Sequence, residues 1–253
     1  KVLNPITNKE VGRYDIPSKD IIQKTIKTVK DDLSWSSLSI KKRCYYIKKF
    51  RKALVKHKDT ISNTIYNETG KPEFDILIEI FTTLEHLKEI TKIARYALNT
   101  SRRSAGLMKT KKAYVKYEPL GVAGVISPWN YPLATPVTSI VEALLAGNKV
   151  VLKPSEHTPM TSALIKKIWD LEIGFENSFK VLMGGGEVGN LMVKSPNVDI
   201  ICFTGSTLVG KKIAKECAET LKPHLLCVLT VSRIHLLCVL KNVKKYLRKI
   251  DNY

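Results

Sequence analysis

Residues 121–130 read Gly-Val-Ala-Gly-Val-Ile-Ser-Pro-Trp-Asn, a short apolar run that stops at a proline. A run of this kind, bounded by turn residues, is typical of a strand that is buried on both faces of a sheet. A second such run, 149–152, stops at Pro154, and apolar residues with helical spacing occupy 137–145 between the two runs. Strand, helix and strand in this order predict a parallel pair joined by a crossover helix, and therefore an α/β fold.

The same alternation continues toward the C-terminus. The apolar pattern predicts strands at 179–182 and 199–203, and helices at 164–169, 188–193 and 209–221. Each predicted strand is followed by a helix that can return the chain to the same end of the sheet. We therefore expect one parallel sheet with crossover helices on its faces.

The first hundred residues have a helical period instead. Ser18 is placed to cap a helix, a second pattern starts near residue 38 and continues to Ile65, and a third covers 76–96. At 112–118 polar and apolar residues nearly alternate, which predicts an edge strand with one solvated face. A mainly helical region should therefore precede the sheet.

Composition places the chain among ordinary globular proteins. Of 253 residues, 44% are hydrophobic and 26% are charged, which argues against disorder and against a fibrous class. No apolar run is long enough to cross a bilayer and the chain opens without a signal peptide, so a cytoplasmic location is expected. The net charge of +19 is spread over many short runs without interleaved aromatic residues, which indicates solvated faces and no specific nucleic-acid site.

The five cysteines and the C-terminal tail contain no recognisable motif for a disulfide framework, a metal site or a further catalytic site. The cysteines form no CxxC pair, which favours free thiols over disulfides or a zinc site, and no metal is expected. The hexapeptide His-Leu-Leu-Cys-Val-Leu occurs at 224–229 and again at 235–240. Residues 241–253 have the pattern of a basic amphipathic helix, for which a solvated terminal helix and a membrane-surface helix are both open interpretations.

Four polar or glycine-rich segments follow predicted strands: 127–132, 153–156, 184–189 and 203–210. Ligands of open α/β sheets bind outside the carboxyl ends of the strands, so these segments predict one concave nucleotide site. Taken alone, the glycine cluster at 184–189 is equally typical of a structural turn. Ser206 alone is equally typical of a plain helix cap.

Together and in this order, the segments resemble the cofactor-binding region of the aldehyde dehydrogenase superfamily, which has the same Pro-Trp-Asn, Lys-Pro-Ser-Glu and Phe-Thr-Gly-Ser sequences. The resemblance is close over 115–223 and looser over the N-terminal helices. It implies an incomplete aldehyde dehydrogenase fold, with an NAD-binding domain at 1–223. Within that domain a helical lead-in, 1–111, precedes a Rossmann-like sheet, 112–223. A tail outside the family pattern follows at 224–253, and the catalytic domain is absent.

The resemblance also implies the cofactor. The family binds NAD(P) and holds the adenosine ribose with a lysine and a glutamate, which match Lys153 and Glu156. A carboxylate near the ribose hydroxyls accepts their hydrogen bonds but repels an added 2′-phosphate. NAD is therefore the expected cofactor, and NADP is less favoured.

Other cofactor contacts carry over by position. Gly185 and Gly189 match glycines beside the adenine. Gly205 and Ser206 match the contact to the pyrophosphate, and Gly210 closes the same turn.

The segment after the first predicted strand should line the cofactor channel with Ile126, Ser127 and Trp129. Asn130 matches the asparagine whose side-chain amide stabilises the oxyanion of a thiohemiacetal intermediate. A turn-forming asparagine before Tyr-Pro is the alternative interpretation of Asn130.

The family pattern fails after Pro223. The family continues with Glu-Leu-Gly-Gly-Lys, whereas here Cys227 takes the place of the general base, and the cysteine nucleophile would lie beyond Tyr253. An abrupt loss of this kind points to a truncation or a shift of reading frame. We therefore expect a chain that binds NAD but oxidises aldehydes, the substrates of the parent family, poorly or not at all.

A different function remains open. The chain could be a noncatalytic protein that binds an intact relative, or an anionic polymer, through its basic surface. Oligomers are possible, although the segments that bridge subunits in the family are missing. Without the other half of the fold, apolar surface should be exposed, which favours aggregation.

Overall fold

Five parallel strands form the centre of the molecule in the computed structural model, which describes residues 1–108 and 110–228. The strands lie in the order β7-β6-β5-β8-β9, and every neighbouring pair is parallel. Their bounds are β5 Val122–Ile126, β6 Lys149–Lys153, β7 Phe179–Val181, β8 Ile200–Gly205 and β9 His224–Val228. The α/β prediction with a parallel sheet is confirmed.

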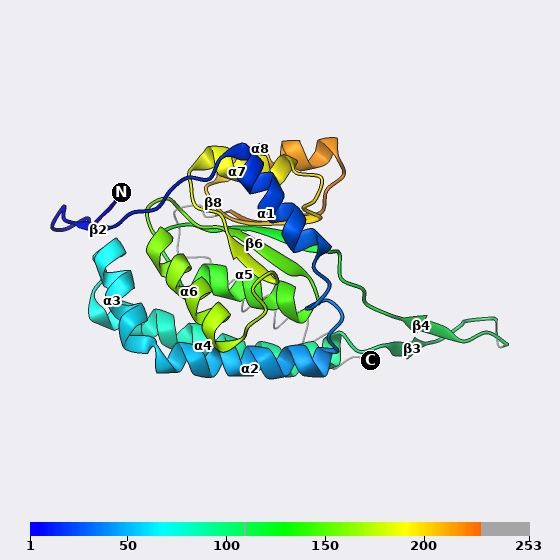
Figure 1. The fold of residues 1–253 in the computed structure, drawn as a ribbon. Coiled ribbons are helices and arrows are strands. Elements are labelled where there is room, and N and C mark those ends of the chain that lie inside the picture. The colour runs from blue at the N-terminus through cyan, green and yellow to red at the C-terminus, as the bar shows by residue number, and fades with distance from the viewer. Residues whose placement is uncertain (109, 229–253) are drawn as a thin grey trace.

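Helices cover both faces of this sheet (Figure 1). One face carries α5 (Ala134–Leu145) and α6 (Pro159–Glu172), and the other carries α1 (Lys19–Asp31), α7 (Gly186–Lys194) and α8 (Thr207–Glu219). Strand β5 is buried along its whole length because alternate side chains enter two different cores. This explains why its sequence is a continuous apolar run rather than an alternating one.

The helical lead-in forms an outer layer against α5 and α6. It consists of α2 (Ile40–Lys56), α3 (Lys58–Thr69) and α4 (Glu73–Ala97). The pattern that runs from residue 38 to Ile65 is therefore two helices, which are separated at His57. Helix α1 begins as predicted, because the Ser18 hydroxyl accepts a hydrogen bond from Ile21 N at 3.4 Å.

A two-stranded hairpin projects away from the helices and the main sheet (Figure 1). It pairs β3 (Ser101–Arg103) with β4 (Ala113–Val115) in antiparallel register. The strand predicted at 112–118 is therefore shorter than expected, and it lies outside the main sheet. A second small ribbon joins β1 (Val2–Leu3) to β2 (Glu10–Gly12) near the N-terminus.

The main sheet continues past Pro223, where the sequence predicted the end of the regular alternation of strands and helices. Strand β9 pairs with β8 from Ile201↔His224 to Gly205↔Val228. The second copy of the hexapeptide and the amphipathic helix predicted at 241–253 lie outside the described residues. Among the helices of the described ranges, none combines the length and apolar character needed to span a bilayer.

Candidate nucleotide-binding site

The order of the strands creates a crevice at the carboxyl end of the sheet. From β5 the chain adds β6 and β7 on one side, and it then crosses to the other side of β5 to add β8 and β9. The turns after β5 and β8 therefore leave the sheet toward opposite faces, which is where open α/β sheets bind their ligands. A cavity of about 1150 Å³ lies at this place.

Nine of the predicted site residues line this cavity. They are Ile126, Ser127, Trp129, Asn130, Lys153, Glu156, Gly189, Gly205 and Ser206. Three strand ends and helix α7 thus bring together segments that are up to 80 residues apart in the sequence. What each residue binds remains a prediction.

Two predicted residues do not line the cavity. Gly185 is the N-cap residue of α7, and its neighbour Gly186 lines the wall instead. At Gly210 a side-chain Cβ would lie 3.3 Å from Val228 Cγ1, so this glycine allows α8 to pack closely against β9. This packing gives a structural reason for a glycine here, and its expected place in the turn of the pyrophosphate contact stays a prediction.

Lys153 and Glu156 form an ion pair across one wall. Lys153 Nζ lies 3.4 Å from Glu156 Oε2, and the lysine side chain is only 6% exposed whereas that of the glutamate is 47% exposed. Burial lowers the pKa of Lys153, and the nearby Glu156 carboxylate opposes that shift. Burial alone would raise the pKa of Glu156, but a backbone hydrogen bond and the Lys153 charge outweigh it, so that pKa is lowered. The pair offers a cation and a partly open carboxylate to a ligand.

Two helices begin at the cavity. The Ser206 hydroxyl accepts a hydrogen bond from Val209 N at 3.4 Å at the start of α8. Helix α7 begins at Gly186 and has no side-chain cap at all. The free N–H groups and the dipole at such helix ends attract anions. The cavity therefore has two places that favour phosphate groups.

Asn130 is placed differently from the other polar residues of the wall. Its side-chain oxygen Oδ1 is buried and accepts no hydrogen bond from any described residue. A buried polar atom without a partner costs roughly 1–3 kcal/mol, and in native proteins it calls for an explanation such as a ligand. The residue before it, Trp129, is 56% exposed at the mouth of the same cavity.

The sequence profile of the aldehyde dehydrogenase family matches residues 1–230. The chain belongs to this family. A putative aldehyde dehydrogenase of Gibberella fujikuroi is 28% identical over 221 residues, which are 87% of this chain and 46% of that protein. The chain thus spans about half the length of the curated relatives it matches.

Solved structures agree with this assignment. An NAD-dependent aldehyde dehydrogenase from Sinorhizobium meliloti has a TM-score of 0.84 and 27% identity, and the match covers 90% of this chain and 46% of that one. An NADP-dependent enzyme from E. coli has a TM-score of 0.84 and 26% identity, with 89% and 47% coverage. Relatives with this fold therefore include users of both nicotinamide cofactors.

One wall of the cavity in this aldehyde dehydrogenase chain was not anticipated. Helix α8 contributes Val209, Lys212, Ile213, Lys215 and Glu216. Four of these have the spacing i, i+3, i+4 and i+7, which places them on one face of a helix. That face follows directly after Ser206, so the helical period combined with the predicted cap was a usable signal.

The described cysteines lie elsewhere. None of the four in the described ranges lines the cavity of about 1150 Å³ in this family member. Cys202 and Cys227 line a second cavity, of about 410 Å³, on the side of the sheet that α5 covers. Burial raises the pKa of Cys202 to about 11, with a smaller contribution from the Glu142 carboxylate. At neutral pH this thiol is protonated, which makes it a poor nucleophile.

Proposed function

We propose that this member of the aldehyde dehydrogenase family binds NAD in the cavity at the carboxyl end of the sheet. The observation that carries the proposal is the convergence of three strand-end turns and two helix N-termini on one cavity of about 1150 Å³. This volume lies slightly above the roughly 300–1,000 Å³ that ligand pockets commonly enclose, as a ligand larger than most would require. NAD would bring the hydride-accepting chemistry, and the chain would bind and orient it.

The residues fit the chemical groups of the cofactor. Ser206 and the first amides of α8 would hold the pyrophosphate. Lys153 and Glu156 would hydrogen-bond the hydroxyls of the adenosine ribose, and the Glu156 carboxylate would disfavour a 2′-phosphate. Asn130 would lie near the nicotinamide end, where its unpaired Oδ1 has hydrogen-bonding capacity to offer.

The proposal includes weak or absent aldehyde oxidation by this chain alone. Cys227 stands at the position of the general base, and the described cysteines lie outside the cavity. Within residues 1–108 and 110–228, no cysteine therefore lines the cavity beside Asn130 to serve as the thiolate nucleophile of the parent family.

Calorimetric titration with NAD, run beside an assay of NADH formation with short aldehydes, tests both parts. We expect one saturable NAD site and no aldehyde-dependent NADH. Failure to bind NAD would refute the cofactor site. Ready turnover by the pure chain would refute the catalytic part and leave the site intact.

A further inference from the structure

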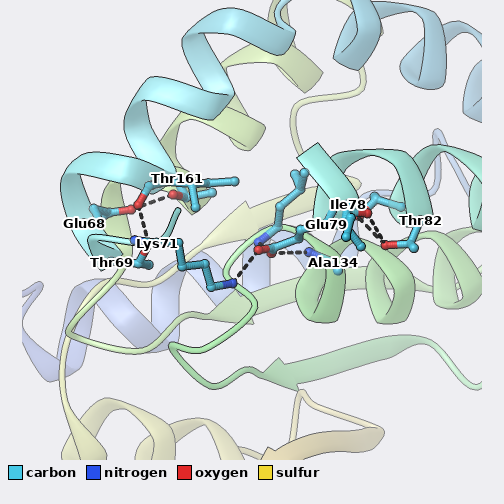
Figure 2. Close-up of polar contacts among 11 residues, drawn as sticks. Glu68, Thr69, Lys71, Ile78, Glu79, Thr82, Ala134 and Thr161 are labelled. Atoms are coloured by element: carbon cyan, nitrogen blue, oxygen red, sulfur yellow. Dashed lines mark hydrogen bonds and ion pairs between the residues drawn. The ribbon is translucent and has the colours of Figure 1, made fainter. Parts of the chain in front are cut away.

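Two buried carboxylates flank the turn between α3 and α4, far in sequence from the cavity. Glu68 is the penultimate residue of α3 and Glu79 lies in the second turn of α4. Each residue is almost fully buried, with 5% and 1% of its surface exposed. Charged residues are seldom buried to this degree unless other groups pair with them. Figure 2 shows that both carboxylates point toward the starts of other helices.

Glu79 caps helix α5. Its Oε1 accepts hydrogen bonds from Leu133 N at 2.9 Å and from Ala134 N at 3.1 Å. Helix α5 has no side-chain cap of its own, so the carboxylate of another helix satisfies these free amides. The other oxygen, Oε2, accepts a hydrogen bond from Lys71 Nζ at 2.7 Å.

Lys71 extends this contact to the turn that holds Asn130. Its ammonium lies 4.2 Å from the centre of the Tyr131 ring, a cation–π distance. The turn 127–133 is thus held at its end by Glu79 and at Tyr131 by Lys71. Trp129 and Asn130 belong to the same turn.

Glu68 caps helix α6, as Glu79 caps helix α5. Its oxygens accept hydrogen bonds from Met160 N at 2.5 Å, Thr161 N at 2.8 Å and Thr161 Oγ1 at 2.6 Å. Helix α6 also lacks a side-chain cap of its own. The segment just before it carries Lys153 and Glu156.

We propose that Glu68 and Glu79 are positioning residues of the nucleotide cavity. Glu79, with Lys71, fixes the turn that presents Trp129 and Asn130, and Glu68 fixes the turn that presents Lys153 and Glu156. The helical lead-in thereby sets the geometry of both walls without touching the ligand. The inference rests on the proposed NAD site, but its effect on Trp129 can be measured without any nucleotide.

The first test uses iodide quenching of tryptophan fluorescence. Trp35 and Trp169 are fully buried, so iodide reports mainly on Trp129, and Trp129→Phe verifies the assignment. Glu79→Gln keeps the shape of the side chain but removes its charge. We expect it to raise the quenching constant about twofold as the turn loosens. Thr83→Val is the matched control, because Thr83 is buried one turn further along α4 and bonds only Glu79 O.

The second test compares AMP, which fills only the adenosine end of the site, with NAD, which fills both ends. Glu79→Gln should weaken NAD about tenfold and leave AMP within about twofold, whereas Glu68→Gln should weaken both about tenfold. Thr83→Val should change neither affinity. If Glu79→Gln behaves like Thr83→Val in both tests, the inference is wrong.

A variant that fails to fold can be distinguished from a proposed site that fails to bind nucleotide. If Glu79→Gln does not fold, Lys71→Met replaces it, and quenching equal to that of the wild type would then overturn the role of the Lys71 contacts with Glu79 and Tyr131 in holding the turn. If the wild-type chain binds neither nucleotide, the proposed function fails. The quenching test still decides whether Glu79 positions the turn.

Discussion

Glu156 is the residue that should decide between the two nicotinamide cofactors. It is the more exposed partner of the ion pair with the buried Lys153, so in the proposed complex its carboxylate would be open to the ribose of NAD. A negative charge there repels a 2′-phosphate, and a neutral amide does not. Relatives of both preferences share the fold, so we expect the choice of cofactor to depend on this charge.

Glu156→Gln should therefore lower the ratio of NAD affinity to NADP affinity about tenfold, mainly because NADP binds more tightly. Calorimetry with both cofactors measures this ratio. Glu187→Gln is the matched control, because Glu187 is exposed in the first turn of α7 but does not line the cavity. An equal change of the ratio in both variants would show that net charge, not the position of Glu156, sets the preference.

The pH dependence of Cys202 alkylation tests whether this residue is buried in the second cavity. Its pKa is raised by burial from 9.0 to about 11, so at pH 8 its thiolate is about a hundredfold scarcer than that of an ordinary cysteine. The rate of alkylation at this residue, followed by peptide mass spectrometry, should stay low at pH 8 and rise as the pH approaches 11. Alkylation at pH 8 as fast as that of a short cysteine peptide would contradict the buried environment.

At the level of single elements, the start of helix α8 contributes to the stability of the fold and to the proposed binding of NAD. Its N-terminus is capped by Ser206, and its next two turns form a wall of the cavity through Val209, Lys212 and Ile213. The cap therefore has two effects. It satisfies a backbone amide, and it presents the helix end to the expected pyrophosphate.

Replacing Ser206 by alanine should lower the free energy of unfolding by about 1 kcal/mol and weaken NAD binding. Ser18→Ala is a close control, because Ser18 caps α1 with the same 3.4 Å hydrogen bond but lies outside the cavity. Urea unfolding should give similar losses for the two variants. Only Ser206→Ala should raise the dissociation constant, and equal affinities in the two variants would exclude a role for Ser206 in binding.

The elements also show what could be predicted from the sequence. Strands β5 to β8 were found because uniform apolar runs and turn residues mark buried strands. Strand β3 was missed because Ser101–Arg103 is polar, and only pairing with β4 makes it a strand. Strand β9 was missed because the repeated hexapeptide resembled a break in the pattern, whereas β8 provides the edge on which it pairs.

The residues of the candidate site also divide into those that the sequence identified and those that it did not. The segments that contain Asn130 and Lys153 were predicted to share one site because polar residues follow strand ends, whereas the roles of the two residues came from the family resemblance. The positioning pair could not be found, because Glu79 and Leu133 are 54 residues apart and no local pattern joins them. Contacts of this kind depend on how helices pack, which a single sequence does not display.

In the whole molecule, the helical lead-in does more than cover the sheet. Its three helices pack on α5 and α6, and its buried carboxylates reach the two turns beside the cavity. On the other face of the sheet, α7 and α8 line the cavity, and α1 packs against α7. The proposed site thus draws on the layers of both faces, and the chain spans about half the length of its relatives.

Large apolar side chains are exposed on two elements of this molecule. On α4, Phe74, Leu77 and Phe81 are 60–70% exposed and share one face of the helix, while Leu225 on β9 is 65% exposed. Surface of this kind favours self-association at high concentration. Binding measurements are therefore best made at low protein concentration.

The most direct test of NAD binding in this cavity is a fluorescence titration with NAD that follows Trp129, with the wild type and Lys153→Met compared at matched folding. We predict a saturable change at one site, and affinity about tenfold weaker when the buried Lys153 ammonium is lost. The absence of a saturable change in the wild type, or equal affinity in the Lys153→Met variant, would contradict the proposed site.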